Sequence, residues 1–268
     1  EDIKSGDTVL QKGRQIKPCD LGLLASLGID SIKVYRKIKV AFFSTGDEII
    51  SLGHSISHGQ VYDSNRYSLI GLLKRLDVEI LDLGVIPDNK KMIEDVLRKA
   101  SDSADVVITT GGVSVGEADY MKEILKSIGE ILFWKISIKP GRPLAYGKIG
   151  STHYFGLPGN PVSTMVTFYQ FVREAIMTLS GQTPIPKIPL IKAKLLSPIK
   201  KIPGRTEFQR GIYEQDDEGI FKVNPLKEQG SGILRSMSEA NCFIVLHEDA
   251  SNLDKDMWVD IQLFDSLF

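Results

Sequence analysis

The sequence predicts an α/β protein with a doubly wound, mostly parallel sheet that has helices on both faces, followed by a small C-terminal all-β, barrel-like domain. From Ile38 to Gly181, apolar strand-like runs alternate regularly with helical patterns, which is typical of parallel βαβ units. After a proline-rich stretch at residues 182–189, short apolar runs are separated by Gly, Asn and Asp turns. This second pattern is typical of a small β domain.

Composition and charge exclude several classes of protein. The 33 basic and 34 acidic side chains of the 268 residues give a net charge of -1, which argues against nucleic-acid binding through a generally basic surface. No stretch approaches the roughly 18 consecutive apolar residues of a membrane-spanning helix, so no membrane contact is expected. Cys19 and Cys242 lie far apart and lack metal-ligand spacing, which fits a reducing cytoplasm.

The chain divides into three segments where its pattern changes. Residues 1–37 are turn-rich and mixed, and we expect them to be the remnant of another domain. Residues 38–186 form the expected α/β domain, and residues 187–268 form the expected β domain. The first residues show no secretory pattern, and we expect them to follow a cut through a longer protein.

Apolar, β-branched runs predict the strands, and capping residues predict where helices begin. Asp63, Ser64 and Asn65 precede one helix, and Asn160 before Pro161 suits the start of another that ends near Gly181. The expected strands of the α/β domain are residues 38–44, 79–86, 105–110, 131–138, 144–149 and 153–157, with further helices at 89–100 and from Ala118. Those of the β domain are residues 190–196, 207–213, 219–223, 242–246 and 257–264.

Acidic residues follow three of the expected strands. Ligands of a doubly wound sheet bind outside the carboxyl ends of its strands, and Glu48, Asp88 and Asp119 lie beyond the first, second and third strands. Acidic side chains at such positions also suit turn and helix caps. Carboxylates beside a phosphate are typical ligands of Mg²⁺, which acts as Lewis acid and template in phosphate-ester chemistry.

The segment TTGGVSVGEADY, residues 109–120, is a candidate anion-binding loop. It combines the hydroxyls of Thr110 and Ser114 with the adjacent Gly111 and Gly112. Glycines allow backbone N–H groups to approach an anion closely. The segment is neither a Walker A loop, because no Gly-Lys-Ser/Thr follows, nor the GxGxxG dinucleotide fingerprint.

The segment WKISIKPGRP, residues 134–143, supplies cations. Lys135 and Lys139 have even spacing, which on a continuous strand would place both on one side, and Arg142 and Pro143 follow in a rigid turn. A fixed group of cations suits an oxyanion or a phosphate, while lysines on a solvated edge strand also guard against aggregation. The segment GLPGNPVS, residues 156–163, places two glycines at a helix start and suits either an anion cradle or a plain turn.

The chain resembles the molybdopterin molybdenumtransferase family, which includes the C-terminal domain of gephyrin. The similar motifs, in order, are FSTGDEI, GQVYDSNR, DVVITTGGVSVGEADYMK, FWKISIKPGRP, GLPGNPVS, GRTEFQRG and NCFIVL. They cover essentially the whole chain. The resemblance implies insertion of molybdate into adenylylated molybdopterin, with release of AMP and formation of the molybdenum cofactor, in a reaction that depends on Mg²⁺.

The resemblance also implies roles for single residues. Glu48, Asp88 and Asp119 would bind Mg²⁺ or orient the phosphoanhydride of the substrate. Spacing alone would not single out Arg210 or Ser231, which correspond to the FQRG arginine and the Gly-Ser serine of the family. The residues implied to hold phosphate, molybdate or pterin are Thr110, Gly111, Gly112, Ser114, Lys135, Lys139, Arg142, Pro143, Arg210 and Ser231.

The resemblance further implies a homodimer whose active site lies between the subunits, and an adenylyltransferase as pathway partner. Full-length members carry upstream residues that contribute to this site and to the dimer. A polypeptide that begins at Glu1 is therefore expected to bind ligand without turnover.

Two other functions fit parts of the sequence. Molybdopterin adenylyltransferases share the βαβ domain, but they lack a C-terminal β domain such as the one that carries FQRG and NCFIVL here. A non-catalytic scaffold, like gephyrin in its receptor-binding use, would leave the carboxylates and lysines without a role.

Overall fold

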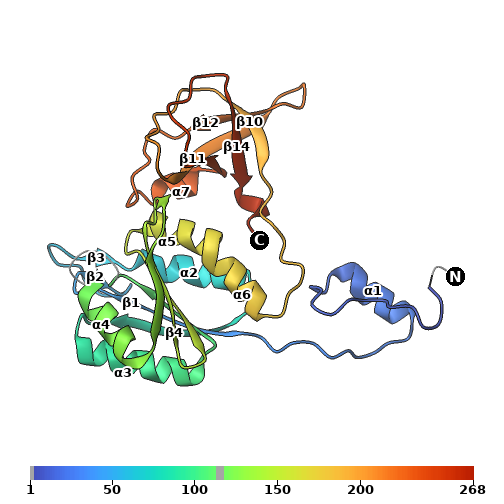
Figure 1. Cartoon of the computed structure of the whole chain (residues 1–268), viewed down its shortest axis with the longest axis horizontal. Helices are drawn as coiled ribbons and strands as arrows, with labels where there is room; N and C mark the ends of the chain where they lie inside the picture. Colours follow the sequence, from blue (N-terminus) through green and yellow to red (C-terminus); the bar gives the residue numbers. More distant parts are fainter. Residues whose placement is uncertain (1–2, 113–117) are drawn as a thin grey trace.

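The computed structural model describes residues 3–112 and 118–268, and two six-stranded sheets dominate this part of the chain (Figure 1). The first sheet consists of β1 (Lys39–Thr45), β4 (Glu79–Ile86), β5 (Val106–Thr110), β6 (Glu130–Lys135), β8 (Pro143–Ile149) and β9 (Thr152–Leu157). Its order is β4-β1-β5-β9-β8-β6. The first four of these strands run parallel, and β8 and β6 add antiparallel pairs at one end. The predicted doubly wound, mostly parallel sheet is confirmed.

Helices cover both faces of the first sheet, as predicted. One face packs against α3 (Lys90–Ser103) and α4 (Ala118–Ile128), and the other against α2 (Ser64–Lys74), α5 (Pro161–Thr167), η1 (Phe168–Val172) and α6 (Arg173–Leu179). Successive side chains of a strand point to opposite faces. Phe42 therefore joins the core beneath α2, whereas Phe43 joins the core beneath α3 and α4. Because both faces are covered, β1 is almost continuously buried, with the apolar run Val40–Phe43 at its centre.

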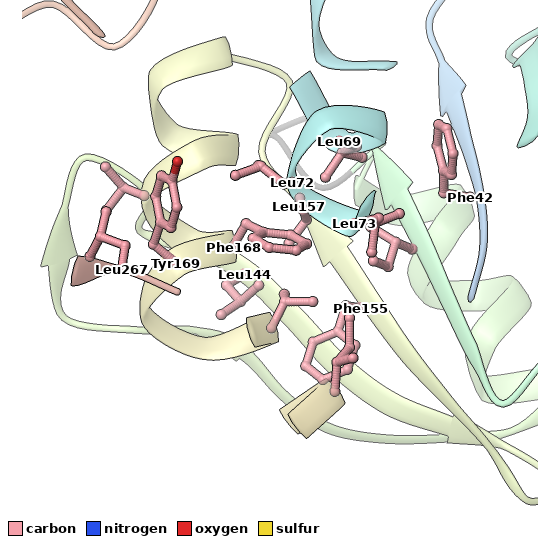
Figure 2. Close-up of a cluster of buried hydrophobic side chains, with 14 of the residues drawn as sticks. Phe42, Leu69, Leu72, Leu73, Leu144, Phe155, Leu157, Phe168, Tyr169 and Leu267 are labelled. Carbon is pink, nitrogen blue, oxygen red and sulfur yellow. The ribbon is translucent and has the colours of Figure 1, made fainter. Parts of the chain in front are cut away.

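The core under α2 and η1 holds this layer against the sheet. Figure 2 shows Leu69, Leu72 and Leu73 of α2 beside Phe168 of η1 and Leu157 of β9. Leu69, Leu73, Phe168 and Leu157 are fully buried. Full burial of one such side chain stabilises the fold by about 1.5–3 kcal/mol. The helical layer that carries the start of α5 is thus firmly attached to the sheet.

The long helix predicted after Asn160 is divided into three segments. Pro161 opens α5 as expected, but the chain widens into a π-helical turn at Phe168–Val172 before α6 ends at Leu179. The hydroxyls of Thr164 and Thr167 donate to the carbonyls of Pro158 and Ser163, at 2.6 and 2.8 Å. The Thr164 bond reaches the loop before the helix, whereas the Thr167 bond reaches the preceding turn, competes with the regular helix ladder and lies just before the wide turn.

The second sheet is the predicted barrel. It contains β7 (Ile138–Lys139), β10 (Ile191–Leu195), β11 (Thr206–Gln215), β12 (Phe221–Pro225), β13 (Cys242–Leu246) and β14 (Trp258–Leu263), in the order β12-β10-β14-β13-β11-β7. An additional pairing of β12 with β11 closes five of these strands on themselves. Small apolar side chains such as Ala193 and Val223, together with Ile244 and Ile261, fill the interior.

The predicted continuous strand at residues 131–138 is wrong. The backbone leaves the first sheet after Lys135, which lies opposite Pro143, and the Ile136 amide donates to the Arg142 carbonyl. Lys139 then pairs with Glu207 of β11 in the barrel. Lys135 and Lys139 therefore belong to different sheets and do not share one face of a strand. The domain boundaries at 37/38 and 186/187 stay predictions. β7 lies before the second boundary, but its partner β11 lies after it.

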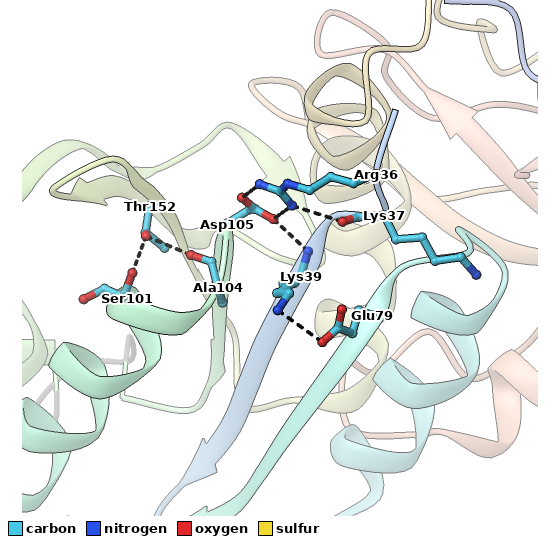
Figure 3. Close-up of polar contacts among 8 residues, drawn as sticks. All are labelled: Arg36, Lys37, Lys39, Glu79, Ser101, Ala104, Asp105 and Thr152. Carbon is cyan, nitrogen blue, oxygen red and sulfur yellow. Dashed lines mark hydrogen bonds and ion pairs between the residues drawn. The ribbon is translucent and has the colours of Figure 1, made fainter. Parts of the chain in front are cut away.

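The chain enters the first sheet through an ion pair at its amino end. In Figure 1, α1 (Pro18–Ser26) lies apart from both sheets, and an extended segment leads from it to β1. Figure 3 shows Arg36 of this segment beside Asp105, with Nη2 and Oδ1 2.6 Å apart, while the Lys39 amide donates to Asp105. The Arg36 hydrogen bond lowers the pKa of Asp105 below its usual range. The pair therefore stabilises the fold above the ordinary carboxyl pKa and loses this effect as Asp105 becomes protonated in acid.

The remaining elements are short. β2 (Ile49–Ile50) pairs with β3 (Val61–Tyr62). In the barrel domain, α7 (Arg235–Glu239) lies between β12 and β13, and η2 (Phe264–Ser266) follows β14. Among the described residues, no helix is both long enough and apolar enough to cross a bilayer.

Gly111 yields a prediction, because it follows β5 at a point where the backbone of β1 comes very close. Its φ is +87°, and an added Cβ would lie 2.3 Å from the Thr45 carbonyl oxygen. We expect Gly111→Ala to destabilise the chain by about 1–3 kcal/mol for the overlap and by about 1–2 kcal/mol more for the left-handed φ. Urea unfolding measures the sum.

Gly150→Ala is the matched control for this prediction. Gly150 also has a positive φ, +60°, but an added Cβ would meet nothing within 4 Å. The free energy of unfolding of Gly150→Ala should fall only by the about 1–2 kcal/mol that the left-handed φ costs. Equal losses for the two variants would show that the contact with Thr45 does not constrain the end of β5.

Candidate functional site

The carboxyl ends of β4, β1, β5 and β9 meet at one edge of the first sheet. At the centre of this edge, the Gly111 backbone lies against the Thr45 carbonyl at the end of β1. On its other side lies Gly159, after β9, where an added Cβ would be 3.8 Å from the Gly111 Cα. Thr110, just before Gly111, is buried and donates to the Ser44 hydroxyl at 3.0 Å. The candidate anion-binding glycines thus lie in a closely packed backbone crossing at the centre of this edge.

Three carboxylates gather on one side of this edge, and we call Asp47, Glu48 and Asp88 the acidic patch. The Asp88 amide donates to Asp47 Oδ1 at 3.1 Å, and the Glu48 carboxylate lies over Gly46. Burial, and then the charges of Asp47 and Glu48, raise the pKa of Asp88. Repulsion of this kind is relieved when a cation binds.

The donor set of the acidic patch fits Mg²⁺ that arrives with a phosphate. Within the described part of the chain, no three acidic, His or Cys side chains are close enough to hold a metal ion by themselves. Mg²⁺ is commonly held by only one or two carboxylates, with substrate phosphate and water completing its shell. Glu48 and Asp88 could supply those carboxylates. Asp119 lies in the first turn of α4, and its side chain, like all of Ser114, falls outside the described residues.

A cationic cavity of about 360 Å³ lies on the other side of the edge, where the first sheet meets the barrel. Lys139, Arg142, Pro143 and Ser231 line it, as expected for an oxyanion site. It is also lined by Arg205, which precedes β11. The other lining residues are Ile138, Pro140, Gly141, Pro158, Gly159, Asn160, Ser163, Gln229 and Gly230. We call this space the oxyanion cavity.

Lys139 lies between the oxyanion cavity and a buried carboxylate. Its Nζ is 3.3 Å from Glu207 Oε2, and the same oxygen accepts a hydrogen bond from Gln209. The Glu207 side chain is 4% exposed, whereas that of Lys139 is half exposed. Glu207 therefore holds the ammonium at the cavity wall. Lys135, by contrast, is not among the described residues that line the cavity, because it remains in the first sheet.

Ser231 is held by the start of α5. Its hydroxyl accepts a hydrogen bond from Asn160 Nδ2 at 3.0 Å, and its carbonyl accepts from the Val162 amide at 3.0 Å. Asn160 occupies the N-cap position, as predicted, but its side chain binds Ser231 and does not cap the helix. The Val162 amide, at the helix start that suited either an anion cradle or a plain turn, thus binds a carbonyl of the barrel domain. These bonds tie the two domains together at the cavity.

Arg210 is not among the described residues that line the cavity, which differs from the expectation. It is 1% exposed, and its guanidinium donates to Ser236 Oγ and to the carbonyls of Glu228 and Gly230, at 3.1, 3.3 and 3.1 Å. Burial lowers the pKa of Arg210 to about 10. Its contacts show that it supports the loop that carries Ser231.

Sequence reasoning missed Arg205, Asn160 and Asp47 as site residues. Arg205 lies in the quoted GRTEFQRG segment, five positions before Arg210, and Asp47 lies beside Glu48 in TGDE. Both were within motifs that pointed to the site. A second cavity of about 820 Å³ lies at the opposite end of the first sheet, between the segment that contains Arg14 and the end of α6, and it contains none of the expected site residues.

Comparison with known proteins explains this arrangement. Residues 41–178 match the family described as the probable molybdopterin binding domain, and residues 192–264 match the MoeA C-terminal region, domain IV. The chain belongs to the molybdopterin molybdenumtransferase family. The resemblance found in its motifs is therefore confirmed, as is the fold.

Individual members of this family are similar over nearly the whole chain. The molybdopterin molybdenumtransferase of Haemophilus influenzae is 46% identical over 267 residues, which are 100% of this chain and 66% of the relative. Gephyrin of Dictyostelium discoideum is 34% identical over 96% of this chain and 41% of its own length. The chain thus spans two thirds or less of these relatives.

Solved structures of this family agree with the fold. Two crystal structures of the molybdopterin biosynthesis MoeA protein of Pyrococcus horikoshii superpose with TM-scores of 0.83 and 0.77, at 31% and 32% identity. Each superposition covers 98% of this chain and 63% of the solved chain. The pairing of a doubly wound sheet with a small barrel is thus shared.

Arg210 and Arg205 are expected to contribute very differently to the free energy of unfolding. Arg210→Met leaves two partly buried carbonyls and the buried Ser236 hydroxyl without their donor, and an unpaired buried group costs about 1–3 kcal/mol. Because removal of the buried charge offsets part of this cost, we expect a net loss of about 2 kcal/mol in the free energy of unfolding.

Arg205→Met is the matched control, because Arg205 is exposed at the same cavity. Its free energy of unfolding should change by less than about 0.5 kcal/mol. Chemical denaturation of both variants makes the comparison. If Arg210→Met were as stable as the parent chain, its carbonyl contacts would not be what holds the Ser231 loop.

Proposed function

We propose that this chain provides the molybdopterin-binding and oxyanion-binding core of a molybdopterin molybdenumtransferase. The proposed reaction inserts molybdate into adenylylated molybdopterin, breaks the phosphoanhydride, and releases AMP and the molybdenum cofactor. The observation that carries the proposal is the oxyanion cavity, in which Lys139, Arg142 and Arg205 surround one space. The names of the similar proteins support the same substrates.

In the proposed mechanism, the cavity residues bind molybdate. Lys139 and the two arginines balance its double negative charge, and the planar guanidinium groups can each make two parallel hydrogen bonds to its oxygens. Ser231, whose hydroxyl is oriented by Asn160, provides a further contact. These groups keep the oxyanion in a fixed position beside the site for the pterin dithiolene.

The acidic patch acts on the other end of the substrate. Glu48 and Asp88 would hold Mg²⁺ together with the phosphoanhydride, and the family resemblance adds Asp119. Bound there, Mg²⁺ supplies charge neutralisation for the departing AMP. Gly111 and Gly112 lie between patch and cavity, where the missing Cβ atoms let the backbone after β5 pack closely against Thr45. The elongated substrate would thus lie along the carboxyl edge of the sheet.

Several finer features belong to the same proposal. The homodimer, with a site shared between subunits, and the adenylyltransferase as pathway partner rest on the family resemblance. The location in the cytoplasm is supported by two free cysteines, Cys19 and Cys242, in a chain without disulfides among its described residues. Turnover by this chain alone is not required by the proposal, since the relatives are longer.

The alternative functions differ in what the barrel is for. An adenylyltransferase needs no barrel, yet Arg205 and Ser231 of the barrel line the oxyanion cavity here. A pure scaffold needs neither the cations nor the acidic patch. Titration calorimetry with AMP and Mg²⁺ separates a ligand-binding enzyme domain from a scaffold, because a scaffold predicts no heat of binding.

An AMP-release experiment tests the proposed function. Adenylylated molybdopterin, molybdate and Mg²⁺ are mixed with the chain, and both the heat of binding and the AMP released are measured. We expect binding that depends on Mg²⁺ and that Asp88→Ala weakens. Any AMP release should fall about 10²–10³-fold in Asp88→Ala, as for loss of one charge-stabilising group.

Asp95→Ala is the control. Asp95 is exposed on α3, and this substitution removes the same charge as Asp88→Ala. It should bind and react like the parent chain. Binding without release would support the expected need for further residues. An absence of Mg²⁺-dependent binding, or full activity of Asp88→Ala, would refute the proposed role of the acidic patch.

A further inference from the structure

The barrel presents Arg205 to the oxyanion cavity on a short loop, residues 202–205, between β10 and β11. The loop is exposed, and Ile202 within it is 83% exposed. An exposed loop of this kind ordinarily allows an arginine many positions, which weakens the binding of a small anion because the side chain must be ordered. The loop therefore needs an anchor.

Lys201 provides that anchor from inside the protein. Although lysine is almost never fully buried, Lys201 is 3% exposed, whereas the neighbouring Lys200 is exposed. Its Nζ donates to the Ile202 carbonyl at 3.0 Å and to the Arg205 carbonyl at 2.8 Å. One ammonium group thus joins the first and last residues of the loop.

The ends of the loop are also fixed to the rest of the fold. The Lys201 amide donates to Asn252 Oδ1 at 3.0 Å, and the Thr206 amide donates to the Ser137 carbonyl at 3.1 Å, just before β7. The Gly204 amide donates to the Glu248 carbonyl. The Thr206 N–H and the Arg205 carbonyl belong to one peptide group, so the bonds to Ser137 and to Lys201 together fix how this peptide lies.

The hydrogen-bond partners of Lys201 indicate that its ammonium sets the geometry of the loop. Across the described residues, the hydrogen-bond partners of its ammonium are two backbone carbonyls. Burying an ammonium group is unfavourable unless its hydrogen bonds are made. An apolar side chain would fill the same space without that cost, so the ammonium is explained by the loop geometry that it imposes.

We propose that Lys201 is a positioning residue of the oxyanion cavity. It holds the backbone of Arg205 so that the guanidinium faces Lys139 and Arg142 across the cavity. Its effect on tetrahedral oxyanions is therefore exerted through Arg205. The identity of the oxyanion as molybdate rests on the proposed function, whereas the positioning role rests on the contacts of the loop.

A double-mutant cycle tests this role, with molybdate alone as the ligand and titration calorimetry as the measurement. Lys201→Met keeps the aliphatic volume and should weaken binding about tenfold, as expected for one lost charge-assisted contact. Arg205→Ala should weaken binding by at least as much. If Lys201 acts through Arg205, the double variant binds like Arg205→Ala alone.

Lys200→Met is the matched control, because it removes the same charge one residue away on the surface. It should bind molybdate like the parent chain. Free energies of unfolding are measured in parallel, since a purely structural lysine would lower stability and its effect on affinity would add to that of Arg205→Ala. Additive effects, or unchanged affinity in Lys201→Met, would overturn the proposal.

Two further measurements keep the test decisive. If Lys201→Met does not fold, Lys201→Gln, which retains an amide donor, replaces it in the cycle. If the parent chain binds sulfate as tightly as molybdate, the proposed function fails while the cycle is completed with sulfate. A parent chain that binds neither oxyanion overturns both proposals.

Discussion

One short stretch of backbone belongs to two sheets, and the candidate site depends on it. Lys135 still pairs with β8 of the doubly wound sheet, while Lys139, four residues later, pairs with β11 of the barrel. The chain must therefore cross between the domains and return at Pro143. The crossing forms one wall of the oxyanion cavity, and the hydrogen bonds from Asn160 and Val162 to Ser231 close the junction from the other side.

The charges of the site are separated by the same architecture. Carboxylates follow β1 and β4, whereas the cations come from the crossing and from the barrel. Beneath the exposed cations, the buried side chains of Lys201 and Arg210 bind backbone carbonyls of the two barrel loops. Because buried polar groups need partners, these contacts determine the shape of the loops. The near-zero net charge of the chain thus conceals two opposed local fields.

Local sequence pattern was sufficient for the layers but not for the connection between them. β1, β4, β5 and α2 were predicted because apolar runs and the Asp63 cap are local signals. The break after Lys135 depends on pairing with a strand some seventy residues away, which local periodicity cannot show. Spacing likewise cannot distinguish a buried arginine from an exposed one. Arg210 was therefore predicted as a site residue only from the family resemblance, and Arg205 was missed. Only the fold shows that one supports the loop and the other lines the cavity.

The most direct test is the location of molybdenum in crystals of this chain soaked in molybdate. Anomalous diffraction at the molybdenum absorption edge identifies the atom without assumptions about its ligands. The account predicts a single dominant peak between Lys139, Arg142 and Arg205, beside Ser231. A dominant peak in the larger cavity near Arg14, or none in the oxyanion cavity, would contradict it.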